Sequence, residues 1–146
     1  MEKKKKEDKY YLPRDISWMY FNRRILQEAT RPHVPLLERM AFLGIYSNNL
    51  DEFFRVRMAT QSRIAECTDK AAAKESEHAR KLIRQIGKLN ARYVEDYEKT
   101  VASVTEALRQ ENIYLVNDAE VTPEQLAFIQ KFYREKLSGS FVPVWF

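Results

Sequence analysis

Hydrophobic residues recur every three or four positions through three long stretches of the chain, and this spacing predicts three amphipathic helices. The first stretch, residues 15–30, places Trp18, Phe21 and Ile25 on one helical face. That face is widened by Ile16, Met19 and Leu26. We expect this broad apolar face to pack against the rest of the protein.

Short polar and proline-containing segments mark where the predicted helices begin and end. Asp15 or Ser17 can cap the first helix, because a short polar side chain accepts a hydrogen bond from first-turn amides. Pro32 and Pro35 interrupt the chain next, since proline disfavours helix before it and is favoured as the first helical residue. We therefore expect a turn between the first two helices.

The second and third stretches predict two long helices. The second runs from Leu36 to about Glu66, and its stripe consists of Leu36, Met40, Leu43, Leu50, Phe54 and Met58. The third runs from about Ala73 to Asn112, and its seam consists of Ala79, Leu82, Ile86, Leu89, Tyr93, Tyr97, Val101, Val104 and Leu108. A narrow seam of this kind is typical of an antiparallel helical hairpin, and its ordinary interpretation is core packing.

The pattern changes after the third helix. The letters IYLV, residues 113–116, predict a short strand, and TPEQ, residues 122–125, is a helix start with Thr122 as the N-cap. The run FVPVWF, residues 141–146, predicts a second strand. A strand, a helix and a strand in this order predict the beginning of an α/β unit.

We therefore expect a mainly α protein with three segments. They are a disordered basic tail over residues 1–14, a helical N-terminal domain with the long hairpin over 15–112, and the first part of an α/β domain over 113–146. The chain ends inside an apolar run, and an exposed apolar edge strand invites aggregation. We expect the second domain to continue beyond Phe146.

Charge and cysteine content narrow the class of protein. The formal net charge is +4, and half of it lies in the first ten residues, which hold five lysines and three acids. Such a run is most simply a solvated tail, and no basic face with interleaved aromatic residues supports binding to nucleic acid. A single Cys67 fits a reducing compartment, and no apolar run approaches a membrane span. These features indicate a cytoplasmic protein, with peripheral membrane contact left open.

Two adjacent asparagines lie inside the second predicted helix, although asparagine is a mediocre helix former. At 100° per residue, Asn48 faces a polar side. Asn49 shares its face with apolar residues at helical spacing, namely Phe42, Ile45, Phe53 and Val56. A buried amide without a partner costs about 1–3 kcal/mol. Asn49 therefore either hydrogen-bonds a neighbouring element or binds a flat ligand such as a nucleobase, and helix geometry leaves both alternatives open.

Two blocks of the sequence, ISWMYFNRRILQEA and PLLERMAFLGIYSNNLDEFFRVRMA, resemble the N-terminal domain of bacterial polyphosphate kinases of the family-1 type. The resemblance is strong over residues 16–59 and looser over the rest of the chain. The matching positions of the first block are Ser17, Trp18, Phe21, Asn22, Arg24, Leu26, Gln27 and Glu28.

The resemblance implies a function for the complete protein. Enzymes of this family transfer the terminal phosphate of ATP reversibly to inorganic polyphosphate through a phosphorylated histidine, with Mg²⁺ serving the phosphates. In their SNNLDEF motif the second asparagine contacts the adenine of ATP, and this position falls on Asn49. The resemblance further implies a head domain after the helical domain and a homo-oligomeric enzyme. It also implies a cytoplasmic location, in which any membrane association would be peripheral and at the inner membrane.

We expect no catalytic or metal-binding residue within this chain. The resemblance implies that the phosphorylated histidine lies in a C-terminal catalytic region absent from this chain, so His33 and His78 do not match it. His33 follows a proline in a loop and His78 lies among charges on the third helix, and we expect both to be surface residues. Asp51 and Glu52 point about 100° apart and do not converge on one ion. We therefore expect the chain to be inactive by itself. The alternative is a non-enzymatic helical interaction module that uses the hairpin as an arm.

Overall fold

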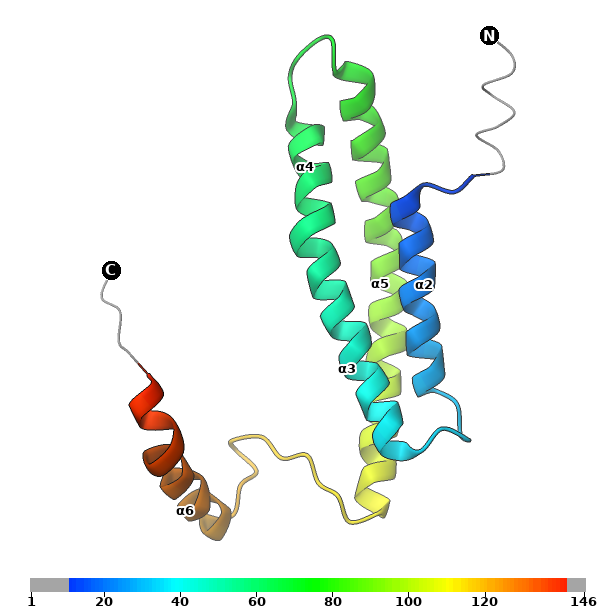
Figure 1. The fold of residues 1–146 in the computed structure, drawn as a ribbon. Coiled ribbons are helices and arrows are strands. Elements are labelled where there is room, and N and C mark those ends of the chain that lie inside the picture. Colours follow the sequence, from blue (N-terminus) through cyan, green and yellow to red (C-terminus); the bar gives the residue numbers. More distant parts are fainter. Residues whose placement is uncertain (1–10, 142–146) are drawn as a thin grey trace. The chain divides into compact units, whose positions relative to one another are not determined.

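The computed structural model describes residues 11–141, which belong to two compact units divided between Glu111 and Asn112 (Figure 1). The described residues are mainly helical, and none of them forms a strand. The helices of the first unit are α2 (Arg14–Ala29), α3 (Leu36–Glu52), α4 (Ala59–Glu66) and α5 (Ala73–Gln110). A π-helical turn, η1 (Phe53–Met58), joins α3 to α4 without a break. The predicted second and third helices are therefore confirmed.

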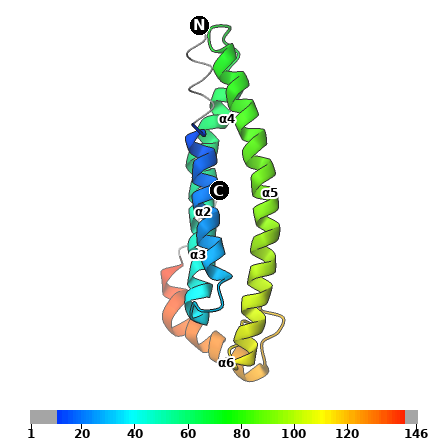
Figure 2. The ribbon, with the colours of Figure 1, turned by 90° about the vertical axis from the view of Figure 1, so that its right-hand side faces the viewer.

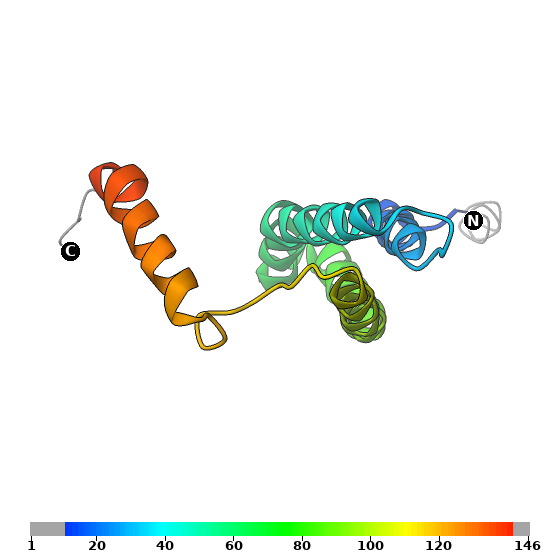
Figure 3. The same ribbon diagram turned by 90° about the horizontal axis from the view of Figure 1, so that it is seen from below.

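The first unit is a helical hairpin with α2 packed alongside it. The continuous α3–η1–α4 helix and α5 form the two arms, while α2 contacts both α3 and α5 (Figure 1). An orthogonal view shows α5 extending along nearly the whole length of the unit (Figure 2). Seen from below, α5 lies on one side of the α2–α3 pair (Figure 3). The predicted hairpin is present, with α2 as a third packed helix.

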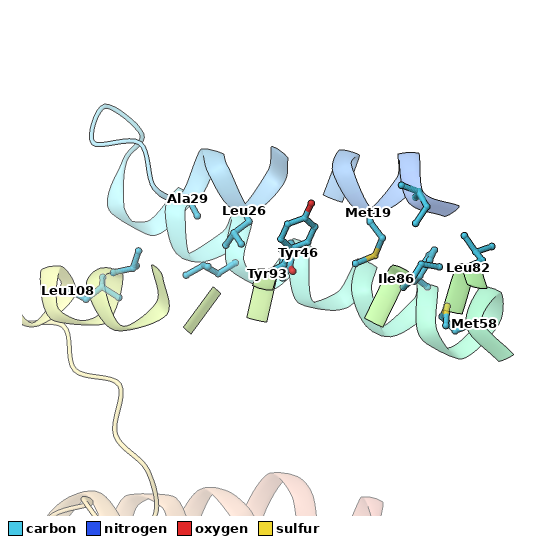
Figure 4. Packing of buried hydrophobic residues seen from close by; sticks show 13 residues of the cluster. Met19, Leu26, Ala29, Tyr46, Met58, Leu82, Ile86, Tyr93 and Leu108 are labelled. Atoms are coloured by element: carbon cyan, nitrogen blue, oxygen red, sulfur yellow. The ribbon is translucent and has the colours of Figure 1, made fainter. Parts of the chain in front are cut away.

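The core of the first unit draws side chains from α2, α3, η1 and α5 (Figure 4). Its buried members are Ile16, Met19, Leu26, Ala29, Leu43, Tyr46, Phe53, Met58, Leu82, Ile86, Tyr93, Val104 and Leu108. Burial of apolar surface contributes roughly 25 cal/mol per Å² and is the main force holding the helices together. The seam predicted on α5 is confirmed by the burial of Leu82, Ile86 and Val104.

The predicted core face of α2 was displaced by about one residue. Ile16, Met19 and Leu26 are buried, whereas Phe21 is 57% exposed and Trp18 only partly covered. This helix carries apolar residues on two adjacent faces, so periodicity alone does not tell which face meets the core. The core face of α2 also carries Asp15 and Asn22, whose polarity masked it in the sequence.

The predicted capping of α2 by Asp15 or Ser17 is wrong. The helix begins directly after Pro13, whose φ of −51° suits the entry to a helix, and no side chain caps it. Asp15 instead lies in the first turn and is buried. Its carboxylate accepts hydrogen bonds from Gln61 at 3.1 Å and from Arg57 at 3.4 Å, which join the start of α2 to η1 and α4.

The π-helical turn changes which residues of the long arm face the core. Phe53 and Met58 are both buried although they stand five positions apart, while Val56 is 51% exposed. Hydrogen bonds of the i to i+5 type insert an extra residue into the helix, so five positions bring the chain back to the same face. The predicted stripe of the second helix is therefore wrong at Phe54, which is 36% exposed, while Phe53 is buried in its place.

The second unit contains α6 (Pro123–Phe132), the π-helical turn η2 (Tyr133–Leu137) and the 3₁₀ turn η3 (Ser138–Ser140). Thr122 and Gln125 form the predicted capping box, with each side chain bonded to the other residue's backbone amide. The expected strand at residues 113–116 is not formed, because a strand needs a hydrogen-bonded neighbour and the described residues provide none. Most of the second expected strand, residues 141–146, lies outside the described residues.

Candidate functional site

The amide of Asn49 is held by a second, buried asparagine on the neighbouring helix. Asn49 Nδ2 on α3 donates a hydrogen bond to Asn22 Oδ1 on α2 at 3.2 Å. Asn22 is only 1% exposed, and its own Nδ2 donates to the backbone carbonyl of Tyr46 at 3.1 Å. The structural alternative for Asn49, a hydrogen bond to a neighbouring helix, is therefore present.

This hydrogen bond uses only part of the Asn49 side chain. A primary amide has two N–H groups and one carbonyl oxygen that can accept twice. One N–H of Asn49 points to Asn22, and the half-buried side chain keeps a second N–H and Oδ1. The helix contact and the binding of a ligand are thus compatible with each other.

Helical spacing places Asn49 on the side of the α2–α3 pair that points away from α5. On α2, Arg23 contacts α5 through Asp96 at 3.7 Å, whereas Asn22 contacts α3. Phe21 lies a further 100° around the helix, away from α5. On α3, Ile45 lies one turn before Asn49 and is 46% exposed.

We call this surface the outer face. Its exposed apolar members are Phe21, Ile45 and Val56, and its partly buried members are Trp18, Ile25 and Phe42. An amide beside exposed apolar side chains offers both hydrogen-bonding groups and apolar surface at one place. The two apolar faces of α2 are therefore a core face and this outer face.

Stacked aromatic rings fix the position of the outer face beside Asn49. The rings of Trp18 on α2 and Phe53 at the start of η1 are stacked, with centroids 4.3 Å apart and planes 11° apart. Offset or stacked aromatic pairs add about 0.5–1.5 kcal/mol beyond the burial of their area. Trp18 lies one helical turn before Asn22, and Phe53 lies one turn after Asn49. The stacked pair therefore holds α2 and α3 in register beside the two asparagines.

Tyr46 connects the asparagine pair to the core. Its ring stacks on Tyr97 of α5 with centroids 5.3 Å apart, and the residue is 2% exposed. Its hydroxyl has no hydrogen-bond partner among the described residues. Burial, together with the nearby Tyr93 and Asp96, raises the pKa of the Tyr46 hydroxyl to about 12.

The other residues considered in the sequence lie at the surface. Asn48, His33 and His78 are exposed, as expected from their patterns. Asp51 is exposed and pairs with Arg55 at 2.6 Å on the same helix. Within residues 11–141, no three acidic, histidine or cysteine side chains gather to hold a metal ion. Nor is any helix of that range long and apolar enough to cross a bilayer.

Asn22 is the residue that the sequence pattern did not single out for the site. It stands three positions after Met19 and four before Leu26, so it is a polar residue on the buried face of α2. The same signal, an amide at helical spacing among apolar residues, drew attention to Asn49. The predicted core face of α2 was centred on Trp18, Phe21 and Ile25, about one residue away from Asn22, so Asn22 did not stand out as a buried amide.

The fold and the paired amides define an all-helical domain with a polar group set in an exposed apolar face. Comparison with known proteins gives its family. The model of the polyphosphate kinase N-terminal domain matches residues 11–116, and the chain therefore belongs to this family.

Curated relatives agree with this assignment. The polyphosphate kinase of Vibrio vulnificus strain YJ016 is 35% identical over 139 residues, which make up 94% of this chain and 19% of the relative. The polyphosphate kinase of Escherichia coli strain K12 is 30% identical over 138 residues, or 94% of this chain and 20% of the relative. The chain thus spans about a fifth of the length of these relatives. No solved structure matches it significantly.

Proposed function

We propose that this chain is the N-terminal part of a polyphosphate kinase and that Asn49 helps to bind the adenine of ATP. The complete enzyme would transfer the terminal phosphate of ATP reversibly to polyphosphate, through a histidine and Mg²⁺-bound phosphates held outside this chain. Residues 113–146 would begin its α/β head domain. The enzyme would be a cytoplasmic homo-oligomer, and any association with the inner membrane would be peripheral.

The observation that carries the adenine proposal is the unfilled hydrogen-bonding capacity of Asn49 on the outer face. An asparagine amide matches the edge of adenine, because its oxygen accepts from the N6 amino group while its N–H donates to a ring nitrogen. The exposed Phe21 and Ile45 supply apolar surface for the ring faces. Family membership supports ATP as the source of that adenine, since the curated relatives are named polyphosphate kinases.

The test is the ATP dependence of the complete enzyme that contains this domain. Asn49→Ala should raise KM for ATP by a few-fold to tens-fold, as expected for a lost hydrogen bond of about 1–2 kcal/mol. Asn48→Ala is the matched control, because Asn48 is the adjacent asparagine and is exposed. It should leave KM unchanged.

An Asn49→Ala enzyme that folds normally and keeps the wild-type KM for ATP would refute the adenine contact. The outer face would then be better explained as a docking surface, since Phe21, Ile45 and Val56 are exposed apolar residues. A non-enzymatic interaction module, which docks a partner through the outer face, is the second candidate function. It predicts that Phe21→Ser changes the oligomeric state or domain contacts and leaves KM for ATP unchanged.

A further inference from the structure

Asn22 is a buried amide whose nitrogen and oxygen each form a hydrogen bond with a defined partner. Its Nδ2 donates to the Tyr46 carbonyl at 3.1 Å, so its Oδ1 is the end left to face Asn49. Asn49 must then present Nδ2 to Asn22, and the two atoms are 3.2 Å apart. A backbone carbonyl cannot exchange roles, so the polarity of the whole chain of hydrogen bonds is set at Tyr46.

We propose that Asn22 is a positioning residue that gives the site its preference for an amino-purine over an oxo-purine. This inference rests on the proposed adenine contact of Asn49. By fixing which end of the Asn49 amide turns towards Asn22, Asn22 also fixes where Oδ1 lies relative to the ligand. An oxygen in that place accepts from the amino group at C6 of adenine.

The opposite orientation of the Asn49 amide would favour a different base. Rotation by 180° exchanges the nitrogen and oxygen, so that an N–H faces the C6 substituent. An N–H repels the amino group of adenine but donates well to the C6 oxygen of hypoxanthine. A site with a fixed amide therefore discriminates between the two bases, because the wrong base leaves buried polar groups unpaired.

Stability alone does not call for this pair of amides. Replacing both partners of a buried hydrogen bond by apolar groups of similar shape can be nearly neutral or stabilising. Asn22 lies on the core face of α2, in line with Met19 and Leu26 on the same helix. A leucine at this place would suit the core but would leave the amide of Asn49 free to rotate.

ATP and ITP form the sharpest probe pair, since they differ only at C6 and the adjacent ring nitrogen. We expect the complete wild-type enzyme to favour ATP in kcat/KM, and Asn22→Leu to lower the ATP to ITP ratio by about tenfold. Asn22→Asp keeps an oxygen that accepts from Asn49, so it should retain the ratio even where stability falls. Asn22→Ala serves in place of Asn22→Leu if the larger side chain prevents folding.

A double-mutant cycle shows whether Asn22 acts through Asn49. In an Asn49→Leu enzyme, adding Asn22→Leu should not change the ATP to ITP ratio further. A folded Asn22→Leu or Asn22→Ala enzyme that keeps the wild-type ratio overturns the inference. If Asn49→Leu raises KM for ATP in the same series, the adenine contact stands and only the role of Asn22 fails. If Asn49→Leu changes neither KM nor the ratio, the proposed function itself fails.

Discussion

The polar groups that α2 and α3 bury are satisfied by hydrogen bonds to different degrees. Asn22 donates and accepts one hydrogen bond each, and Asp15 accepts two. The Tyr46 hydroxyl is buried without a partner in the described part of the chain. An unpaired buried hydroxyl costs about 1–3 kcal/mol by the measure of protein mutants, so Tyr46 contributes packing through its ring and a penalty through its oxygen.

This penalty predicts that Tyr46→Phe stabilises the protein. Phenylalanine keeps the ring that stacks on Tyr97 and removes the buried oxygen, so the free energy of unfolding should rise by about 1 kcal/mol at neutral pH. Urea denaturation followed by circular dichroism measures it. A loss of stability in Tyr46→Phe would show that the hydroxyl has a favourable partner.

The raised pKa of Tyr46 also predicts a dependence of stability on pH. The folded protein keeps the Tyr46 proton up to about pH 12, whereas the unfolded chain releases it near the ordinary value of 10.0. Between these values the unfolded state binds fewer protons, so stability falls as pH rises, by up to about 1.4 kcal/mol per pH unit. The stability that the Tyr46 proton contributes is fully present below about pH 10 and is lost as the pH rises to about 12. A Tyr46→Phe variant should not show this loss of stability between the two pH values.

At the scale of elements, the π-helical turn is the least regular feature of the hairpin. It keeps Phe53 and Met58 on the core face although five positions separate them. Removing one exposed residue from this turn would leave the two residues four positions apart, which is the spacing of a regular α-helix. The turn can therefore lose a residue without moving the flanking helices out of phase.

Two single-residue deletions test this description of η1. Deleting Arg55, which is exposed within the turn, should lower the free energy of unfolding by no more than about 1–2 kcal/mol. Deleting the exposed Asn48 in α3 should cost clearly more, because it rotates Leu43 and Tyr46 by 100° relative to Phe53. Chemical denaturation of both variants gives the comparison. Equal losses would contradict the role of the π turn as an insertion.

The hydrophobic spacing was enough to predict the bounds of the long helices and the hairpin, and the TPEQ motif predicted the capping box at Thr122. It could not place the core face of α2, because polar Asp15 and Asn22 lie on that face and apolar Phe21 lies on the other. It also could not reveal the π turn, since a count of 100° per residue assumes a regular helix. For the site, the pattern identified Asn49, but its bond to Asn22 required the packing of two helices.

At the scale of the whole molecule, the chain is a domain whose relatives are about five times longer. The first unit supplies a rigid helical hairpin with an outer apolar face, and the second adds α6. The histidines of the described residues are exposed and lie outside the outer face. In the proposed enzyme, a histidine outside this chain would carry out the phosphoryl transfer.

A direct consequence is that residues 1–146 alone should not make polyphosphate from ATP. Incubation of the purified chain with ATP labelled at the terminal phosphate should yield no labelled polymer, while the complete enzyme yields it under the same conditions. Polyphosphate synthesis by the purified 146-residue protein would show that it contains a catalytic group. That result would contradict the proposal that the catalytic histidine lies outside this chain.

Asn49 is proposed to contact the adenine of ATP from the outer face. The most direct measurement is a structure of the complete enzyme with a non-hydrolysable ATP analogue. We predict that an amide atom of Asn49 lies within about 2.7–3.2 Å of a hydrogen-bonding atom of the adenine, while Nδ2 still contacts Asn22. An adenine bound elsewhere, with Asn49 buried against another domain, would contradict this contact.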